Sequence, residues 1–172
     1  MESKVKLAGH AIHPMLIVFP LGLFATAVIF DLIYLVTGNA ILGEVAYWNI
    51  LAGIIGGLVA AVFGFADWLH IPDGTRAKAV GLQHGAGNVV IVVLFAIAWL
   101  LRGGNANHEV TTVPMVLEIV GVLLALVTGW LGGELVERLR VGVDDNANLN
   151  APSSLTGSAA QPSVPAHPNP KA

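Results

Sequence analysis

Histidines and carboxylates are the side chains of this sequence that can do chemistry, because it contains no cysteine. The absence of thiols excludes disulfides, thiol nucleophiles and cysteine-held iron–sulfur clusters. Most of the polar residues fall at the ends of long apolar segments, at one predicted depth. They are His10, His13, His70, His84, Asp67 and Glu134. Imidazoles and carboxylates bind metals and transfer protons, so this grouping predicts a metal, haem or proton-relay site.

The sharpest local pattern is the sequence GHAIHP, which contains His10 and His13. Pro14 suits the first position of a helix, because its φ is fixed and it has no N–H to lose, and this predicts His13 as the N-cap. Pro20 lies further along the same segment, where it removes one helical hydrogen bond and frees the carbonyl of Leu16. The plainer interpretation is a helix start with polar flanks.

A second pattern is the connection DWLHIPDGTR, which begins at Asp67. Pro-Asp-Gly is typical of a turn, and Thr75 can cap the helix that follows. A loop this short holds His70 near His84, and glycines on both sides of His84 leave space around its ring.

Two further carboxylates, Asp31 and Glu118, fall inside apolar segments near the opposite end. An ionisable group within a membrane span is costly and indicates a function by default. The two groups could share a proton, or one could pair with Arg102. The alternative is that each is protonated and only hydrogen-bonds neighbouring helices.

Four apolar segments must position these residues, and the composition indicates that their solvent is lipid. Charged residues make up 11% of the 172 residues and the mean hydropathy is +0.76, whereas soluble domains carry about 25% charged residues. The segments are residues 14–37, 45–68, 82–101 and 113–135. Each can cross a bilayer as a helix, and the short connections make sequential helices antiparallel neighbours. We therefore predict an all-α integral membrane four-helix bundle over residues 1–143 and, from composition, a disordered tail over residues 144–172.

The positive residues predict the orientation of this bundle. One side carries Lys4, Lys6, Arg76, Lys78, Arg138 and Arg140. The other side carries Arg102 alone, so we expect both termini to be cytoplasmic. This indicates a multi-pass protein of the bacterial cytoplasmic (inner) membrane. The net charge of −3 and the lack of a basic run argue against a nucleic-acid partner. The expected partners are the lipid bilayer and either a membrane redox partner or further copies of the chain.

Small residues form stripes on two of the predicted helices. The second carries Gly53, Gly57, Ala60 and Gly64, and the fourth carries Gly121, Ala125, Gly129 and Gly132. Such stripes let membrane helices approach closely, so they predict packing surfaces, with Val92 of the third helix expected to face lipid. Alternatively, they leave room for a flat cofactor. The two halves of the chain also form a weak internal repeat, which would be parallel about an axis along the membrane normal.

The chain resembles a family of bacterial predicted membrane proteins of unknown function. The resemblance rests on GHAIHPMLIVFPLGL, GFADWLHIPDGTRAKAVGLQHGAGN and GWLGGELVERLRVGV, and it spans residues 9–143. It implies a four-helix membrane domain that occurs, in some relatives, beside Rieske-type iron–sulfur domains. It implies no activity, and a chain without cysteine would need a partner for any such cluster.

Three functions fit these residues. The first is a small redox subunit that binds haem b through His13 and His84, with His10 and His70 as further candidates. A porphyrin-free divalent metal would instead use His10, His13 and His84 with Asp67 or Glu134. The second function is a proton-coupled carrier, and the third is a structural or assembly subunit without a cofactor. A serine hydrolase is not expected, because no serine lies within the apolar segments.

Overall fold

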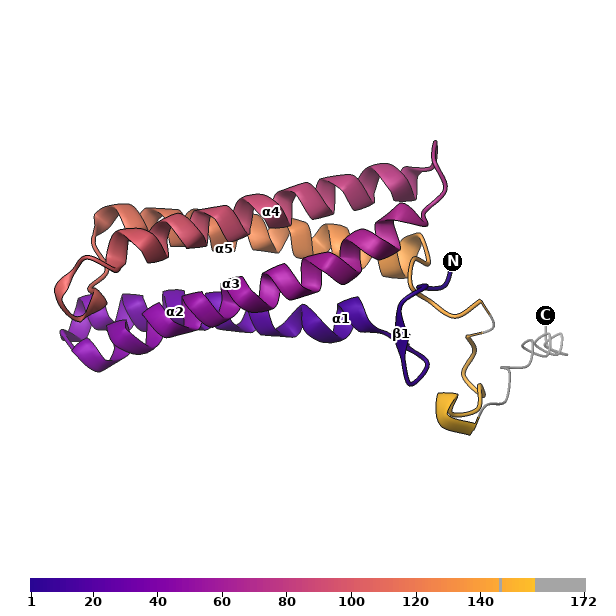
Figure 1. Cartoon of the computed structure of the whole chain (residues 1–172), viewed down its shortest axis with the longest axis horizontal. Coiled ribbons are helices and arrows are strands. Elements are labelled where there is room, and N and C mark those ends of the chain that lie inside the picture. Colours follow the sequence, from indigo (N-terminus) through magenta and orange to yellow (C-terminus); the bar gives the residue numbers. More distant parts are fainter. Residues whose placement is uncertain (146, 157–172) are drawn as a thin grey trace, which may run out of the picture.

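The computed structural model describes residues 1–145 and 147–156, and helices make up most of it (Figure 1). Two short N-terminal strands, β1 (Lys6–Leu7) and β2 (His10–Ala11), form an antiparallel hairpin. The α-helices are α1 (Ile12–Leu16), α2 (Val18–Thr37), α3 (Ala40–Leu69), α4 (Arg76–Arg102) and α5 (Thr112–Gly133). Three short elements complete the description: the 3-10 turns η1 (Ala106–His108) and η3 (Ser154–Thr156), and the π-helical turn η2 (Glu134–Arg138).

Four helical stretches are long and apolar enough to cross a membrane. They are Ile12–Thr37, Ala40–Leu69, Arg76–Arg102 and Ala106–Arg138. The predicted all-α membrane fold with four spans is therefore confirmed. Of the predicted C-terminal tail, residue 146 and residues 157–172 lie outside the described residues, and disorder of the tail stays a prediction.

Two helices begin earlier than their apolar segments, because polar side chains cap them. The Asn39 side chain accepts a hydrogen bond from the backbone N–H of Ile41, so α3 starts at Ala40. The predicted cap at Thr75 is confirmed: its hydroxyl accepts from the N–H of Lys78, and α4 starts directly after it. Capping satisfies backbone donors that have no partner in the first helical turn. These capped turns are polar, so hydropathy alone places the starts of both helices too late in the sequence.

The first span is interrupted between α1 and α2, next to Pro20. Proline has no N–H to donate to the Leu16 carbonyl, and α1 ends at that residue. The predicted N-cap role of His13 is wrong, because Ala11 is the N-cap and His13 lies inside α1. The β1–β2 hairpin leads the chain directly into the helix, with the N–H of Ile12 donating to the Val5 carbonyl.

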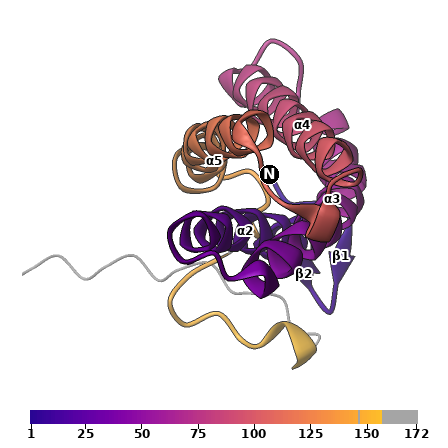
Figure 2. The ribbon, with the colours of Figure 1, turned by 90° about the vertical axis from the view of Figure 1, so that its left-hand side faces the viewer.

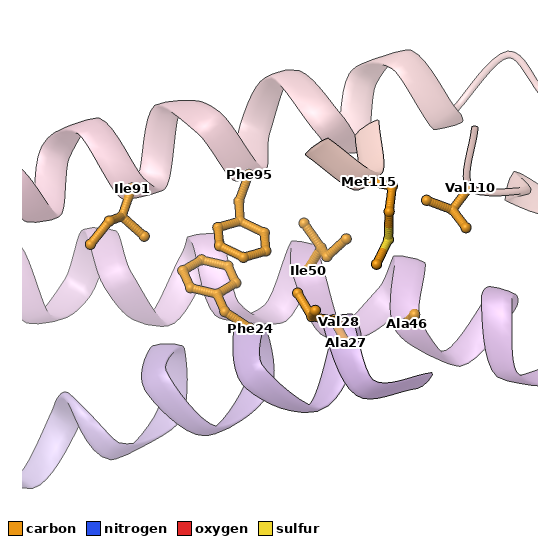
Figure 3. Packing of buried hydrophobic residues seen from close by; sticks show 9 residues of the cluster. All are labelled: Phe24, Ala27, Val28, Ala46, Ile50, Ile91, Phe95, Val110 and Met115. Atoms are coloured by element: carbon orange, nitrogen blue, oxygen red, sulfur yellow. The ribbon is translucent and has the colours of Figure 1, made fainter. Parts of the chain in front are cut away.

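Viewed along its length, the bundle has α2, α3, α4 and α5 arranged in a ring, so that α2 lies diagonally across from α4 (Figure 2). The buried core fills the centre of this ring (Figure 3). There Phe24 and Phe95 stack across the diagonal, with ring centroids 4.0 Å apart and planes at 6°. The Phe24 ring lies over Gly53 and the Phe95 ring over Gly121. These two members of the predicted stripes therefore make room for aromatic rings rather than for a neighbouring backbone.

Residues equivalent in the two halves of the chain meet along the bundle axis. Asp31 and Arg102 form an ion pair and are separated by 71 residues. The same separation holds for the two stacked phenylalanines and for His13 and His84, whose rings also meet. A parallel repeat about a lengthwise axis would produce contacts of this kind, and the repeat itself stays a prediction.

We name the two ends of the bundle by these contacts. The histidine end carries the β1–β2 hairpin, the α3–α4 loop and η2, and the arginine end carries residues 38–39 and 103–111 (Figure 1). At the histidine end, the Met1 ammonium donates to the Arg140 carbonyl, and the Gly142 N–H donates to the Met1 carbonyl. The N-terminus is thus tied to the segment that follows η2.

Candidate functional site

His13 on α1 and His84 on α4 face each other across the bundle. Their ring centroids are 6.3 Å apart and their planes are nearly perpendicular, at 89°. Both side chains are half-buried. The structure therefore brings together two histidines that belong to diagonally opposite helices.

A backbone carbonyl from the next membrane span fixes each imidazole. Nδ1 of His13 is 2.9 Å from the carbonyl oxygen of Ala60, and Nδ1 of His84 is 2.8 Å from that of Thr128. A carbonyl can only accept, so each Nδ1 is the protonated nitrogen. In the neutral rings Nε2 then carries the free lone pair, which is the atom that binds a metal or accepts a proton.

Glycines seat both rings against the helices that supply these carbonyls. A Cβ added at Gly64 would lie 2.7 Å from Cε1 of His13, and one added at Gly132 would lie 3.2 Å from Cε1 of His84. Each glycine lies one helical turn after the residue whose carbonyl accepts from the ring. These two stripe residues therefore serve the histidine pair directly.

The two halves differ at the Nε2 atoms. The Asn88 side-chain amide lies 3.1 Å from Nε2 of His84 and also donates to the His84 carbonyl. The Asn88 amide oxygen in turn accepts from the Thr128 hydroxyl at 3.2 Å. Within the described residues, Nε2 of His13 has no hydrogen-bond partner. Asn88 thus holds one imidazole of the pair, while the other keeps its lone pair free.

The other predicted histidines do not join this pair. Nδ1 of His10 bonds the carbonyl of Ala8, and Nδ1 of His70 bonds the carbonyl of Ala66. Both side chains are exposed. Their hydrogen bonds are local to the hairpin and to the end of α3, so neither ring contributes to the site.

The two predicted carboxylates are engaged elsewhere. Asp67 accepts from the Ser3 hydroxyl at 2.6 Å and from the Lys4 N–H at 3.3 Å, which ties the N-terminal segment to α3. Glu134 pairs with Arg76 at 2.7 Å. Neither carboxylate is therefore hydrogen-bonded to an imidazole of the pair, because backbone carbonyls accept from both rings. Within residues 1–145 and 147–156, no three histidine, aspartate or glutamate side chains gather as a metal-binding group.

A second polar cluster lies at the arginine end, where Arg102 contacts both buried carboxylates. Its Nη1 lies 2.6 Å from Asp31 and 3.0 Å from Glu118, and its Nη2 lies 2.9 Å from the other oxygen of Asp31. All three side chains have 0% exposure. The sequence suggested that one of the two acids could pair with Arg102, and in the structure both acids do so.

Comparison with known proteins assigns the chain to a family. The model of a family described as "Predicted membrane protein (DUF2231)" matches residues 9–145. The chain belongs to the DUF2231 family. No curated protein and no solved structure matches it. The matched range of this DUF2231 protein includes all four spans, the histidine pair and the arginine cluster.

One group of residues in the DUF2231 chain was not singled out by its sequence. His108 of η1 stacks on Tyr47 with ring centroids 3.8 Å apart, and its Nδ1 lies 2.7 Å from the Glu44 carboxylate. The His108 carbonyl accepts from Nε of Arg102, which links this group to the buried cluster. These residues come from a loop and a helix start, where hydropathy has no periodicity to reveal them. The one signal in the sequence was His108 itself, which lies near the buried Glu118 along the chain.

Proposed function

We propose that this protein is a small membrane redox subunit in which His13 and His84 would hold haem b through their Nε2 atoms. The observation that carries the proposal is the pairing of two imidazoles across the bundle axis, each with Nδ1–H donated to a backbone carbonyl. Metal-bound histidines are oriented by such hydrogen bonds, which also raise their basicity. Haem held by two imidazoles would supply one-electron chemistry.

The spacing of the rings supports this use. Bonds between a metal and imidazole nitrogen are about 2.0–2.1 Å long, so two imidazoles bound from opposite sides of one metal would have centroids roughly 6 Å apart. The observed separation of 6.3 Å agrees with that value. The distance between the two rings therefore supports the proposal that they share one metal.

The number of ligands favours haem over a metal ion without a porphyrin. Structural and catalytic divalent ions generally need three or four protein ligands. The described part of the chain offers no such group, and only two of the five predicted metal ligands lie together. Two imidazoles suffice for haem, since the porphyrin provides the other four nitrogens.

Asn88 holds the His84 ring in place while no metal is bound. Its amide group donates to Nε2 of His84, and the Thr128 hydroxyl holds its oxygen. This contact keeps His84 in the tautomer that a metal requires. For Nε2 of His84 to bind a metal, the Asn88 amide would have to release it, and the bonds of Asn88 to the His84 carbonyl and to Thr128 could then hold the amide.

We further propose that the histidine end faces the cytoplasm, in a bacterial cytoplasmic membrane. The six basic residues that follow the positive-inside pattern all lie in segments at that end. Arg102, at the other end, is neutralised by buried carboxylates and adds no free positive charge there.

A redox role also requires an electron-transfer partner. The occurrence of Rieske-type domains beside some relatives is consistent with an iron–sulfur protein in that role.

Haem titration of the detergent-purified protein tests the proposal. We expect one haem per chain and a Soret band typical of two imidazole ligands. His13→Ala and His84→Ala should each lose that spectrum, because each removes one axial ligand. The exposed His10→Ala and His70→Ala are matched controls and should retain it.

Two outcomes would overturn this function. One is a folded wild-type protein that binds no haem, and the other is equal loss of the spectrum in the pair variants and the controls. Metal analysis of the same sample extends the test, because a stoichiometric metal without a Soret band would identify a porphyrin-free ion instead.

A further inference from the structure

The arginine end has a fully paired guanidinium at its centre. Beyond its bonds to the two acids, Arg102 donates from Nε to the His108 carbonyl at 3.0 Å and from Nη2 to the Gly43 carbonyl at 2.9 Å. A guanidinium has five N–H donors, and these contacts together with those to Asp31 and Glu118 engage each of them. Arg102 has no donor left for a further acceptor.

Charge balance in this cluster requires a proton. One guanidinium neutralises one carboxylate, and a second carboxylate at the same buried place would leave an uncompensated negative charge. Such a charge is very costly away from water, so the group takes up a proton instead.

The neighbouring titratable groups do not supply the missing positive charge. The groups that border the cluster are Glu44 and Tyr47 of α3 and His108 of η1. Nδ1 of His108 is paired with the Glu44 carboxylate at 2.7 Å rather than with either buried acid. Within the described residues, Arg102 is the cation that faces Asp31 and Glu118.

The geometry identifies which acid is protonated. Asp31 uses both oxygens to accept from Arg102, as expected of an ionised carboxylate in a bidentate pair. Glu118 accepts from Arg102 only through Oε1, and its buried Oε2 accepts no hydrogen bond in the described part of the chain. The Glu118 carboxyl group lies next to the Asp31 carboxylate, which can accept from it when Glu118 is protonated. A proton on Oε2 removes the excess charge at the one carboxyl oxygen that Arg102 does not reach.

We propose that Glu118 carries one exchangeable proton and that the arginine end is a proton-binding site of this membrane protein. Release moves the proton alone, without electrons, and leaves the cluster with one net negative charge. The partly exposed His108–Glu44 pair is linked to the cluster through the His108 carbonyl, which accepts from Arg102. The site is at the opposite end from the histidine pair and does not depend on haem.

Infrared spectroscopy of the detergent-purified protein tests this site. At neutral pH we expect the carbonyl stretch of one buried protonated carboxylic acid, and its shift in D2O shows that the proton exchanges. Glu118→Gln should remove the band, because the amide keeps the bond to Arg102 but carries no acidic proton. Glu137→Gln, which changes an exposed glutamate, is the matched control and should retain it.

Labelling with ¹³C-glutamate tests the assignment in the unaltered protein, whatever the stability of the variant. The band should move with the label. A band that does not move would assign the proton to an aspartate, and the absence of any such band at neutral pH would show both acids to be ionised. Either result overturns the proposal, as would a band that moves with the label but persists in folded Glu118→Gln.

The pH dependence of stability gives a second readout. At neutral pH the unfolded chain has released the Glu118 proton while the folded chain retains it. The folded state therefore binds more protons, and stability falls as pH rises. We expect the wild-type Tm to fall with rising pH and the slope to be smaller in Glu118→Gln. Equal slopes in the two proteins would contradict a proton on Glu118.

Discussion

Substituting Gly53 by alanine places a methyl group directly against the stacked phenylalanines. The added Cβ would lie 2.6 Å from Cε1 of Phe24, closer than real Cβ contacts allow. Phe24 has little room to move, because its ring stacks on that of Phe95 with the ring centroids 4.0 Å apart. The helix or the ring stack must therefore move.

Two opposing contributions determine how much Gly53→Ala changes the free energy of unfolding. Overpacking a well-packed core costs about 1–3 kcal/mol. Replacing glycine by alanine within a helix returns about 1 kcal/mol. Gly22→Ala is the matched control, since no atom lies within 4 Å of its added Cβ and it also lies within a helix. The helix contribution cancels between the variants, so Gly53→Ala should be about 1–3 kcal/mol less stable than Gly22→Ala.

Reversible unfolding in mixed detergent micelles measures this difference. Phe24→Leu in the Gly53→Ala background should recover part of the loss, because a smaller side chain relieves the contact and the two sites are coupled. Gly121→Ala should behave like Gly53→Ala, since its added Cβ lies 2.7 Å from Cε2 of Phe95. Equal stability of Gly53→Ala and Gly22→Ala would refute the packing described for the core.

Further predictions concern the buried ion cluster, a helix cap, the tail and the orientation. Arg102→Met should destabilise the protein by about 3–5 kcal/mol, because it leaves buried charge uncompensated, whereas Arg76→Met, which removes an exposed pair, should change stability by at most about 1 kcal/mol. Thr75→Ala should lower the free energy of unfolding by about 1 kcal/mol through loss of the cap, whereas Thr75→Ser should keep most of the stability that the cap contributes. Equal free energies of unfolding for the two variants would argue against capping. Deleting the residues after Asp145 should leave the Tm unchanged, and a large decrease would show that the tail packs. Reporter fusions in the α2–α3 connection should read external and those in the α3–α4 loop internal, and the opposite readings would reverse the proposed orientation.

Hydropathy was sufficient to predict the four spans, because lipid requires long apolar helices and permits few alternatives. Helix starts were harder to predict, since the caps at Asn39 and Thr75 act in polar turns outside the apolar segments. Topology also predicted that His13 and His84 share one end of the bundle. The rotation of each helix decides whether such rings meet, and no short-range pattern encodes that rotation.

The carboxylates and the small-residue stripes show where sequence spacing is insufficient. Asp67 is satisfied by Ser3, which is 64 residues away and lies in a segment without hydropathy periodicity. Gly129 was expected to be a packing position, but no atom lies within 4 Å of its added Cβ. Val92, expected to face lipid, has Cγ2 3.1 Å from the Cβ position of Gly57. A stripe shows which residues share a helix face, and only the neighbouring helix determines what that face meets.

The central claim is that His13 and His84 bind one haem iron together, and electron paramagnetic resonance of the ferric, haem-loaded protein tests it most directly. If both imidazoles bind the iron and keep their perpendicular planes, at 89°, the protein should give a low-spin signal with strong anisotropy. That signal should disappear in His13→Ala and in His84→Ala and persist in His10→Ala. A high-spin signal from the wild-type protein, or a low-spin signal unchanged in both pair variants, would contradict the account.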